Sequence, residues 1–265
     1  MTLKACITGV GVLGPGLADW PAAARVLAGA VAWTAAPVVL PQPAALPSAE
    51  RRRTGAAVRL TLAVGLEAST RAGINPASLP VVFSSSGGDG QNCHEICEVL
   101  ASSERALSPT RFHNSVHNAP AGYWGIATGA TAATNSLCAY DASFAAGLLE
   151  ALCQLAAERR PVLLIAYDTT YPEPMRSVRP IPAAFGVALL LAPPGAAGAL
   201  AEIRVERSHA PPDSLEDAAL EQLRTAVPAA RSLPLLARLA CGRSGAVHIE
   251  YLDGASIALA VSHAA

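Results

Sequence analysis

The sequence is poor in aromatic residues and in charge. Aromatic side chains make up 5% of its 265 residues and charged ones 15%, and the formal net charge is -1 at neutral pH. A chain so close to neutrality has no electrostatic footprint for nucleic acid or for an anionic membrane surface. It also lacks any uninterrupted apolar run of the ~20 residues needed to cross a bilayer. The start, MTLKACITGV, is too briefly apolar for a signal peptide. We therefore expect no nucleic-acid partner and no membrane span.

Cysteine is scattered through the chain without the spacing of a disulfide framework: Cys6, Cys93, Cys97, Cys138, Cys153 and Cys241. Such spacing favours reduced thiols and a cytoplasmic protein. Cys93 and Cys97 share a helix face, but a metal site needs two further ligands and no matching pair follows. The turn Ser84–Gly90 lacks both a GxGxxG and a GK[ST] pattern for phosphate binding. We expect no metal and no cofactor.

Apolar residues are abundant instead. They make up 52% of the chain, which is high for a soluble monomer. A large and weakly charged surface suggests that another subunit covers part of the exterior. The length is sufficient for one large α/β domain with a real core.

Strand-like and helix-like segments alternate along the chain, which favours a single α/β domain. The expected strands are Leu3–Gly9, Val81–Ser85, Val162–Tyr167, Phe185–Ala192, Ala201–Arg207, Ala246–Tyr251 and Ser256–Ser262. The expected helices are Leu17–Gly29, Ala57–Arg71, Asn92–Ala101 and Ser214–Arg224. Four prolines make the segment Val31–Ser48 an irregular connection.

The stretch Ser108–Glu150 is the most informative part of the sequence. It predicts a polar turn, a small-residue helix, a short strand, a tight bend and a helix that is apolar on every side. A helix without a polar face must be enclosed. A strand, a sharp turn and a buried helix are the order in which folds present a nucleophile at a helix N-terminus. The residues of the bend are Leu137, Cys138, Ala139, Tyr140 and Asp141.

The segment NSVHNAPAGYWGIATG (114–129), followed by this strand, bend and helix, resembles the N-terminal half of β-ketoacyl synthases. The opening ITGVGVLGPG and the later VLLIAYDTT and FGVALLLA fit the same order of elements. The resemblance implies a thiolase-like α/β fold, with a mixed sheet, a buried central helix and a second half that is missing or minimal. Residues 1–265 would form a single domain, in which 1–207 resemble the synthase half and 208–265 are a divergent extension.

Departures from the family pattern argue against catalysis. A synthase needs a thiolate and two histidines from its C-terminal half. None of the later histidines has the HGT-like setting of the synthases: His209, His248 and His263. When the small-residue helix is aligned with that of the synthases through Gly147, the family's nucleophile falls at Ala139, one position after Cys138. We expect Asp141 to cap the following helix and to raise the pKa of a neighbouring thiol. Cys138 should therefore be a poor nucleophile.

An alternative uses Cys138 as the nucleophile of a stand-alone acyltransferase or thioesterase, with His113 or His117 as its base. Spacing alone does not place either histidine beside Cys138. Both could instead cap the asparagine-rich turn through bonds to the backbone, with Asn118 as scaffold.

Short synthase-like chains without the reactive groups resemble chain length factors of aryl polyene biosynthesis. The resemblance implies a non-catalytic subunit that forms a heterodimer with a full-length, active β-ketoacyl-ACP synthase in polyketide or fatty-acid-type synthesis. Acyl carrier protein is a further candidate partner, and a homodimeric scaffold is the other open arrangement.

The same resemblance implies where the partner would bind. The strand before the bend would pair edge to edge across the dimer axis, through Thr134, Asn135, Ser136 and Leu137. Phe112 and Tyr140 are the large side chains that would reach toward the partner's tunnel. For Phe112, a place in the ordinary core is an equal alternative.

Overall fold

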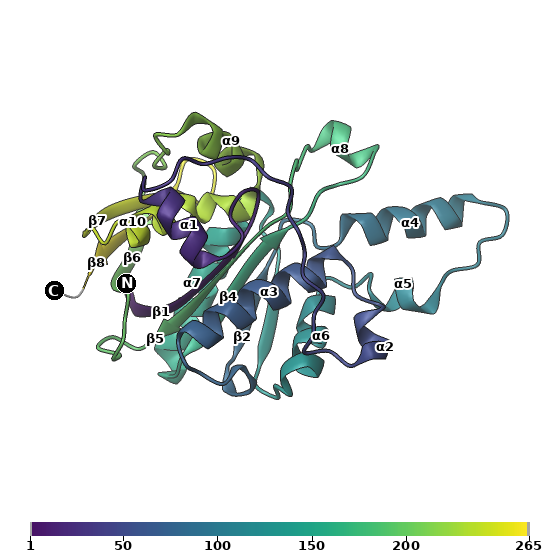
Figure 1. Cartoon of the computed structure of the whole chain (residues 1–265), viewed down its shortest axis with the longest axis horizontal. Coiled ribbons are helices and arrows are strands. Elements are labelled where there is room, and N and C mark those ends of the chain that lie inside the picture. The colour runs from purple at the N-terminus through teal and green to yellow at the C-terminus, as the bar shows by residue number, and fades with distance from the viewer. Residues whose placement is uncertain (1, 264–265) are drawn as a thin grey trace.

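The computed structural model describes residues 2–263, and its centre is one eight-stranded mixed sheet of order β3-β2-β4-β5-β1-β6-β8-β7 (Figure 1). The strands are β1 (Leu3–Leu13), β2 (Val81–Ser84), β3 (Thr134–Leu137), β4 (Val162–Asp168), β5 (Phe185–Ala192), β6 (Ala201–Ser208), β7 (Gly245–Glu250) and β8 (Ser256–Ser262). β2 runs parallel to both β3 and β4, and the other neighbouring strands are antiparallel. The expected mixed α/β sheet is confirmed.

The helices are α1 (Trp20–Leu27), α2 (Ser48–Arg51), α3 (Ala56–Arg71), α4 (Gly90–Ala101), α5 (Pro109–His113), α6 (Ala119–Thr128), α7 (Ser143–Glu158), α8 (Met175–Val178), α9 (Ala218–Ala226) and α10 (Leu233–Ala240). Three short 3₁₀ turns join them, η1 (Pro76–Ser78), η2 (Tyr140–Ala142) and η3 (Pro228–Ser232). Among the residues described, no helix has the length and apolar character that a membrane crossing requires.

Helices cover both faces of the sheet. α3 and α6 pack on one face around a core that contains Phe83, Trp124 and Tyr167. α7, α1, η3 and α10 cover the other face, around Phe144 and Phe185. Every residue of β4 and of β5 is buried, as expected for strands with helices on both sides.

The first face is packed closely because glycines remove side chains from β1. A Cβ on Gly11 would lie 2.0 Å from the carbonyl oxygen of Val64 in α3, and one on Gly9 would lie 2.2 Å from that of Ala68. The backbones of β1 and α3 can approach this closely only without those side chains.

α7 is not enclosed on all sides in the isolated chain. Its buried face includes Phe144 and Leu148, but Cys153, Ala156 and Ala157 on the opposite side are exposed. The expectation of a fully enclosed helix is therefore wrong for this chain alone. The exposed face lies beside the edge strand β3, where the side-chain amide of Asn135 donates to Glu150 Oε1 at 2.8 Å.

The segment after Ser208 continues the same sheet, because β8 pairs with β6 and β7 pairs with β8. Other segments of the same chain form hydrogen bonds with backbone groups on the outer edge of β7. Asp213 N donates to the His248 carbonyl oxygen at 2.9 Å, and the Arg238 guanidinium donates to that of Ala246 at 3.3 Å. At the opposite end of the sheet, β3 has no strand on its outer side within the described residues.

Candidate functional site

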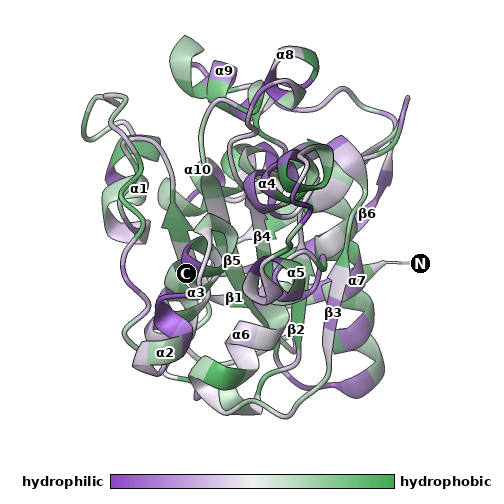
Figure 2. Cartoon of the chain, turned by 90° about the vertical axis from the view of Figure 1, so that its right-hand side faces the viewer, coloured by the Kyte–Doolittle hydropathy of each residue, from purple (hydrophilic) through white to green (hydrophobic). Residues whose placement is uncertain are grey.

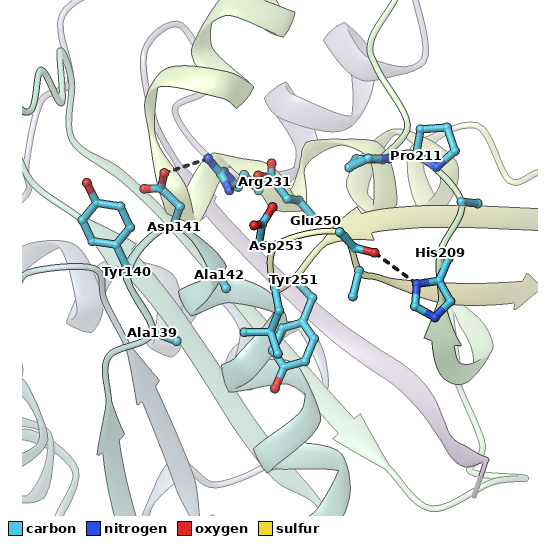
Figure 3. A pocket seen from close by; sticks show the side chains of 15 residues that line it. Ala139, Tyr140, Asp141, Ala142, His209, Pro211, Arg231, Glu250, Tyr251 and Asp253 are labelled. Atoms are coloured by element: carbon cyan, nitrogen blue, oxygen red, sulfur yellow. Dashed lines mark hydrogen bonds and ion pairs between the residues drawn. The ribbon is translucent and has the colours of Figure 1, made fainter.

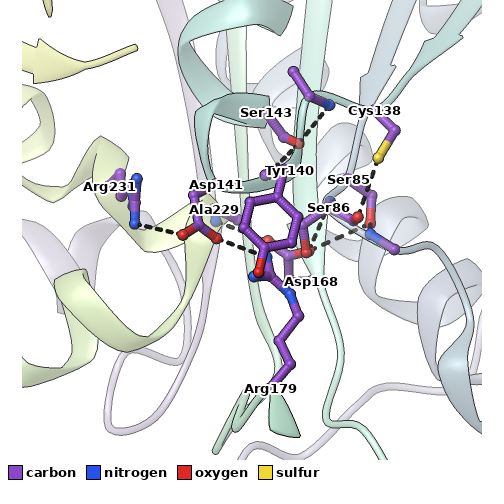
Figure 4. A network of polar contacts seen from close by, with 12 residues as sticks. Ser85, Ser86, Cys138, Tyr140, Asp141, Ser143, Asp168, Arg179, Ala229 and Arg231 are labelled. Atoms are coloured by element: carbon purple, nitrogen blue, oxygen red, sulfur yellow. Dashed lines mark hydrogen bonds and ion pairs between the residues drawn. The ribbon is translucent and has the colours of Figure 1, made fainter. Parts of the chain in front are cut away.

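The bend between β3 and α7 has a strained backbone that side chains hold in place. Tyr140 has φ +51°, in the left-handed region that non-glycine residues rarely adopt. The Ser143 hydroxyl accepts a hydrogen bond from Ala139 N at 3.0 Å and donates one to the Tyr140 carbonyl oxygen at 2.7 Å (Figure 4). The residues presented at the head of α7 are thus an alanine and a tyrosine, neither of which is a thiol.

Cys138 lies at the end of β3 and is exposed. Its thiol donates to the carbonyl oxygen of Ser86, with Sγ and O 3.1 Å apart (Figure 4). A thiolate has no proton to donate and would lose this contact. Among residues 2–263, no histidine forms a hydrogen bond with Cys138.

The two upstream histidines have other surroundings. His113 is exposed at the end of α5, and its ring packs edge-on against Tyr123 with 6.2 Å between the ring centroids. His117 is half-buried between α5 and α6, and its Nε2 is buried with no hydrogen-bond partner in the described part of the chain. Neither donates to the backbone as a cap. Asn114 and Ser115 make the side-chain bonds of the turn. The Asn114 amide donates to the Arg53 carbonyl oxygen at 2.8 Å and accepts from the Tyr123 hydroxyl at 3.1 Å, and the Ser115 hydroxyl donates to the Phe112 carbonyl oxygen at 2.8 Å.

Asp141 does not cap α7, contrary to the expectation from sequence. The N-cap is Ala142, and it makes no side-chain cap bond. The Asp141 carboxylate instead binds two guanidinium groups, Arg179 Nη2 at 2.6 Å and Arg231 Nη2 at 3.2 Å (Figure 4). Local capping propensity was overridden by two arginines that the fold brings from distant segments. Arg179 also lies over the Tyr140 ring, with Cζ 3.6 Å from its centroid.

Asp168 is a buried carboxylate that the sequence analysis did not single out, and it binds Ser86, whose carbonyl oxygen contacts Cys138 of the bend. Asp168 ends β4 and is 2% exposed. Its oxygens accept hydrogen bonds from Ser86 N at 2.9 Å, Ser86 Oγ at 2.6 Å and Ala229 N at 2.8 Å. Burial raises the pKa of Asp168 to about 6, although the bonds from Ser86 and Ala229 oppose the shift. The signal was present, because an acidic residue directly after a fully apolar strand requires partners.

A groove of about 490 Å³ opens at the bend (Figure 3). One wall is the bend itself, and the other comes from the segment after Ser208. Arg231 crosses between them, since its Nη1 binds Glu250 Oε1 at 2.9 Å while Nη2 binds Asp141. The residues that line it are Ala139, Tyr140, Asp141, Ala142, His209, Ala210, Pro211, Pro212, Arg231, Glu250, Tyr251, Leu252, Asp253, Gly254 and Ala255.

The groove does not have the chemistry of a condensing site. Of the three later histidines, only His209 lines it, and its Nδ1 lies 3.1 Å from the Gly254 carbonyl oxygen. His248 pairs with Asp213 and His263 bonds the Leu200 carbonyl oxygen, both outside the groove. In the described residues, no group of three or more histidine, cysteine, aspartate or glutamate side chains is arranged to hold a metal ion.

The residues expected at a partner interface lie on one side of the molecule. Figure 2 is viewed from this side, with α4, α5, α6 and α8 toward the viewer and β3 and α7 at the right of the view. Phe112 is 67% exposed and Tyr140 is 61% exposed, so the alternative that Phe112 belongs to the ordinary core is wrong for this chain alone. Thr134 and Asn135 are exposed and Ser136 and Leu137 half-buried along a hollow of about 600 Å³. Most of the exposed large apolar side chains lie on these elements or in the segments that connect them: Leu100, Phe112, Val116, Ile126, Tyr140, Met175 and Val178.

Solved structures of ketosynthase complexes share this architecture. One chain of the complex between the ketosynthase ApeO and its chain length factor ApeC, from Xenorhabdus doucetiae, has a TM-score of 0.74 and 25% identity over 97% of this chain and 99% of that one. The ishigamide ketosynthase/chain length factor gives 0.74 and 15% identity, over 99% and 100%. The AntDE:AntF complex, an acyl-carrier protein with its ketosynthase, gives 0.78 and 12%, over 100% of both chains.

A β-ketoacyl synthase from Burkholderia phymatum is matched over only 71% of its length, with a TM-score of 0.60, 16% identity and 91% of this chain covered. No curated protein sequence matches the chain. A model of the β-ketoacyl synthase N-terminal domain matches residues 20–249. Together with the mixed sheet and its two helical layers, this match confirms the expected thiolase-like fold. The chain is a ketosynthase-like protein and belongs to the β-ketoacyl synthase N-terminal domain family.

Proposed function

We propose that this chain is a non-catalytic subunit, similar to a chain length factor, that pairs with a full-length, active β-ketoacyl-ACP synthase. The observation that carries the proposal is the bend before α7. Ala139 and Tyr140 occupy the head of the helix, Asp141 is bound by two arginines, and the Cys138 thiol donates to a carbonyl oxygen. Acyl transfer needs an activated nucleophile next to a base, and this arrangement provides neither.

The similarity to chains of ketosynthase/chain length factor structures supports a pairing role. The chain matches chains in structures described as ketosynthase complexes with chain length factors, with a TM-score of 0.74 in both cases. A subunit that shares the synthase fold without its reactive groups can contribute through its surface alone.

The open edge of β3 supports the mode of pairing. Val81 N donates to the Ala133 carbonyl oxygen, and Ser85 N donates to that of Leu137. The backbone N–H and C=O groups of the odd-numbered residues of β3 therefore face β2. The backbone groups of Thr134 and Ser136 therefore face outward, because successive residues of a strand point in opposite directions. A strand of the synthase would extend the sheet there. Phe112 and Tyr140 lie on the same side of the molecule and would reach toward the tunnel of the synthase.

The proposed setting is a cytoplasmic polyketide or fatty-acid-type pathway of the aryl polyene class, with acyl carrier protein as a further partner. Neither a metal nor a cofactor is needed for this role. The length of the acyl chain would be set where the two subunits meet.

The test is co-expression with a full-length synthase encoded beside this chain, followed by size-exclusion chromatography and a condensation assay. We expect a one-to-one heterodimer, with condensation by the complex and none by this chain alone. Turnover or a covalent acyl adduct on the isolated chain would contradict the proposal. So would a stable homodimer that takes up no synthase.

A further inference from the structure

The Asp141 carboxylate lies between two guanidinium groups that come from different parts of the fold. Arg179 follows α8, and its Nη2 is 2.6 Å from Oδ1. Arg231 belongs to η3, and its Nη2 is 3.2 Å from Oδ2. Each oxygen of the carboxylate thus has its own cationic partner, as Figure 4 shows. Hydrogen bonds in which both partners are charged are the strong class.

Both arginines are held in place by contacts other than Asp141. The Arg231 side chain is 9% exposed and forms an ion pair through Nη1 with Glu250 Oε1 at 2.9 Å. The guanidinium of Arg179 stacks on the Tyr140 ring at 3.6 Å. An arginine also keeps its positive charge at any accessible pH. The contacts with Glu250 and with the Tyr140 ring would keep both groups beside the position of the carboxylate if it were removed.

Solvent can reach this position. The Asp141 side chain is 38% exposed and forms part of the wall of the groove at the bend. A small solute could enter the groove and occupy the same place without any rearrangement of the sheet.

We propose that Arg179 and Arg231 form a site for an anion of the carboxylate class, which the chain fills with its own Asp141. The internal carboxylate pairs with both guanidinium groups. Of these residues, Asp141 and Arg231 line the groove, and Arg179 contacts the carboxylate from outside the groove lining. Exogenous carboxylates are thereby kept out of the groove of the native chain. The inference is independent of the proposed pairing function, since it concerns this chain alone.

The test is chemical rescue of Asp141→Ala in the full chain, followed by thermal unfolding. Removing the carboxylate leaves two facing cations, so the Tm of the variant in sodium chloride should fall by several degrees. Sodium formate at equal ionic strength should raise the Tm of Asp141→Ala saturably, because a ligand that binds only the folded state stabilises it. The native chain should show no difference between the two salts.

Three control variants separate the site from a general salt effect. Glu158→Ala breaks the exposed pair between Glu158 and Arg160 and should show no formate rescue. Asp141→Asn keeps the volume of the side chain, so formate has no space to enter and should not rescue it. Arg231→Met in the Asp141→Ala background should abolish the rescue.

Equal effects of formate and chloride on Asp141→Ala would overturn the proposal. If that variant does not fold in chloride, its refolding yield is measured in formate and in chloride, and the same yield in both salts would overturn the proposal equally. Rescue that persists after Arg231→Met would also contradict it, since the anion would then bind elsewhere.

Discussion

At the bend before α7, the backbone of Tyr140 is strained, and the side chains of Ala139 and Tyr140 are not nucleophiles. A non-glycine residue in the left-handed region costs about 1–3 kcal/mol, and Tyr140 is held there by the Ser143 hydroxyl and by Arg179 over its ring. Folds commonly keep such strain to aim a nucleophile. Here the strain presents an aromatic ring, which is suited to contact and not to acyl transfer.

Cys138 should react no faster with iodoacetamide than the other exposed thiols. Its Sγ donates to the Ser86 carbonyl oxygen and has no histidine bonded to it in the described chain. Cys153 and Cys241 are exposed on other elements and serve as internal references. Mass spectrometry of tryptic peptides after timed labelling at neutral pH would compare the rates. Labelling of Cys138 much faster than both references would favour a working nucleophile.

The buried Asp168 should make stability depend on pH. Burial raises its pKa to about 6 from the ordinary 3.8, so the folded chain binds this proton more tightly than the unfolded chain does. Its contribution to the free energy of unfolding is therefore fully present below about pH 4 and is lost as the pH rises through about 6. Asp168→Asn removes this titration. The advantage of the native chain over Asp168→Asn should shrink by roughly 3 kcal/mol between about pH 4 and pH 7.

Urea unfolding of both proteins across that range would measure this difference. Glu158→Gln, at an exposed position, is the matched control and should show no such trend. A gap between native chain and Asp168→Asn that stays constant with pH would contradict the prediction.

At the scale of elements, the contact between β1 and α3 depends on residues without side chains. Gly11→Ala would place a methyl group 2.0 Å from the Val64 carbonyl oxygen, and backbone atoms cannot move aside as a flexible side chain can. We expect the free energy of unfolding to fall by about 3 kcal/mol, at the upper end for overpacking.

Gly122 in α6 provides the matched control, because a Cβ there meets nothing within 4 Å. Gly122→Ala should stabilise the chain by about 0.5–1 kcal/mol through helix propensity. Chemical denaturation of the two variants would measure both changes. Equal and small effects would show that β1 and α3 can separate at little cost.

Most strands could be predicted from sequence because apolar runs bounded by turn residues are local signals. β5 begins and ends as expected, and β2 and β4 differ by one residue at one end. Helix ends were less predictable. α1 begins at Trp20 because Asp19 caps it and Pro21 is tolerated in its first turn. α10, with its short apolar run, was missed.

The candidate site was only partly predictable for a different reason. The order of strand, bend and helix is local, and the structure has these elements in the expected order. The partners of Asp141 lie 38 residues away at Arg179 and still further along the chain at Arg231. Those of Asp168 lie in β2's following loop and in η3. Such pairings are set by tertiary packing, which capping propensity does not contain.

At the scale of the whole molecule, assembly should depend on the outer side of β3. Ser136→Pro removes an N–H that faces away from β2, so the native sheet keeps its bonds while the edge loses a donor. We expect the variant to fold with little loss of stability and to elute without the synthase. Ser136→Ala keeps the N–H and should elute with it. Retention of the complex by Ser136→Pro would show that the strands do not pair there.

The two ends of the sheet differ in a way that limits the size of any assembly. The backbone of β7 already bonds to Asp213 and Arg238 of its own chain, whereas β3 is open. A chain with one unpaired sheet edge can pair with one neighbouring chain through that edge, and no unpaired edge then remains for a third chain. Growth into fibres requires an unpaired strand at both ends of the sheet. Association through β3 therefore stops at two chains.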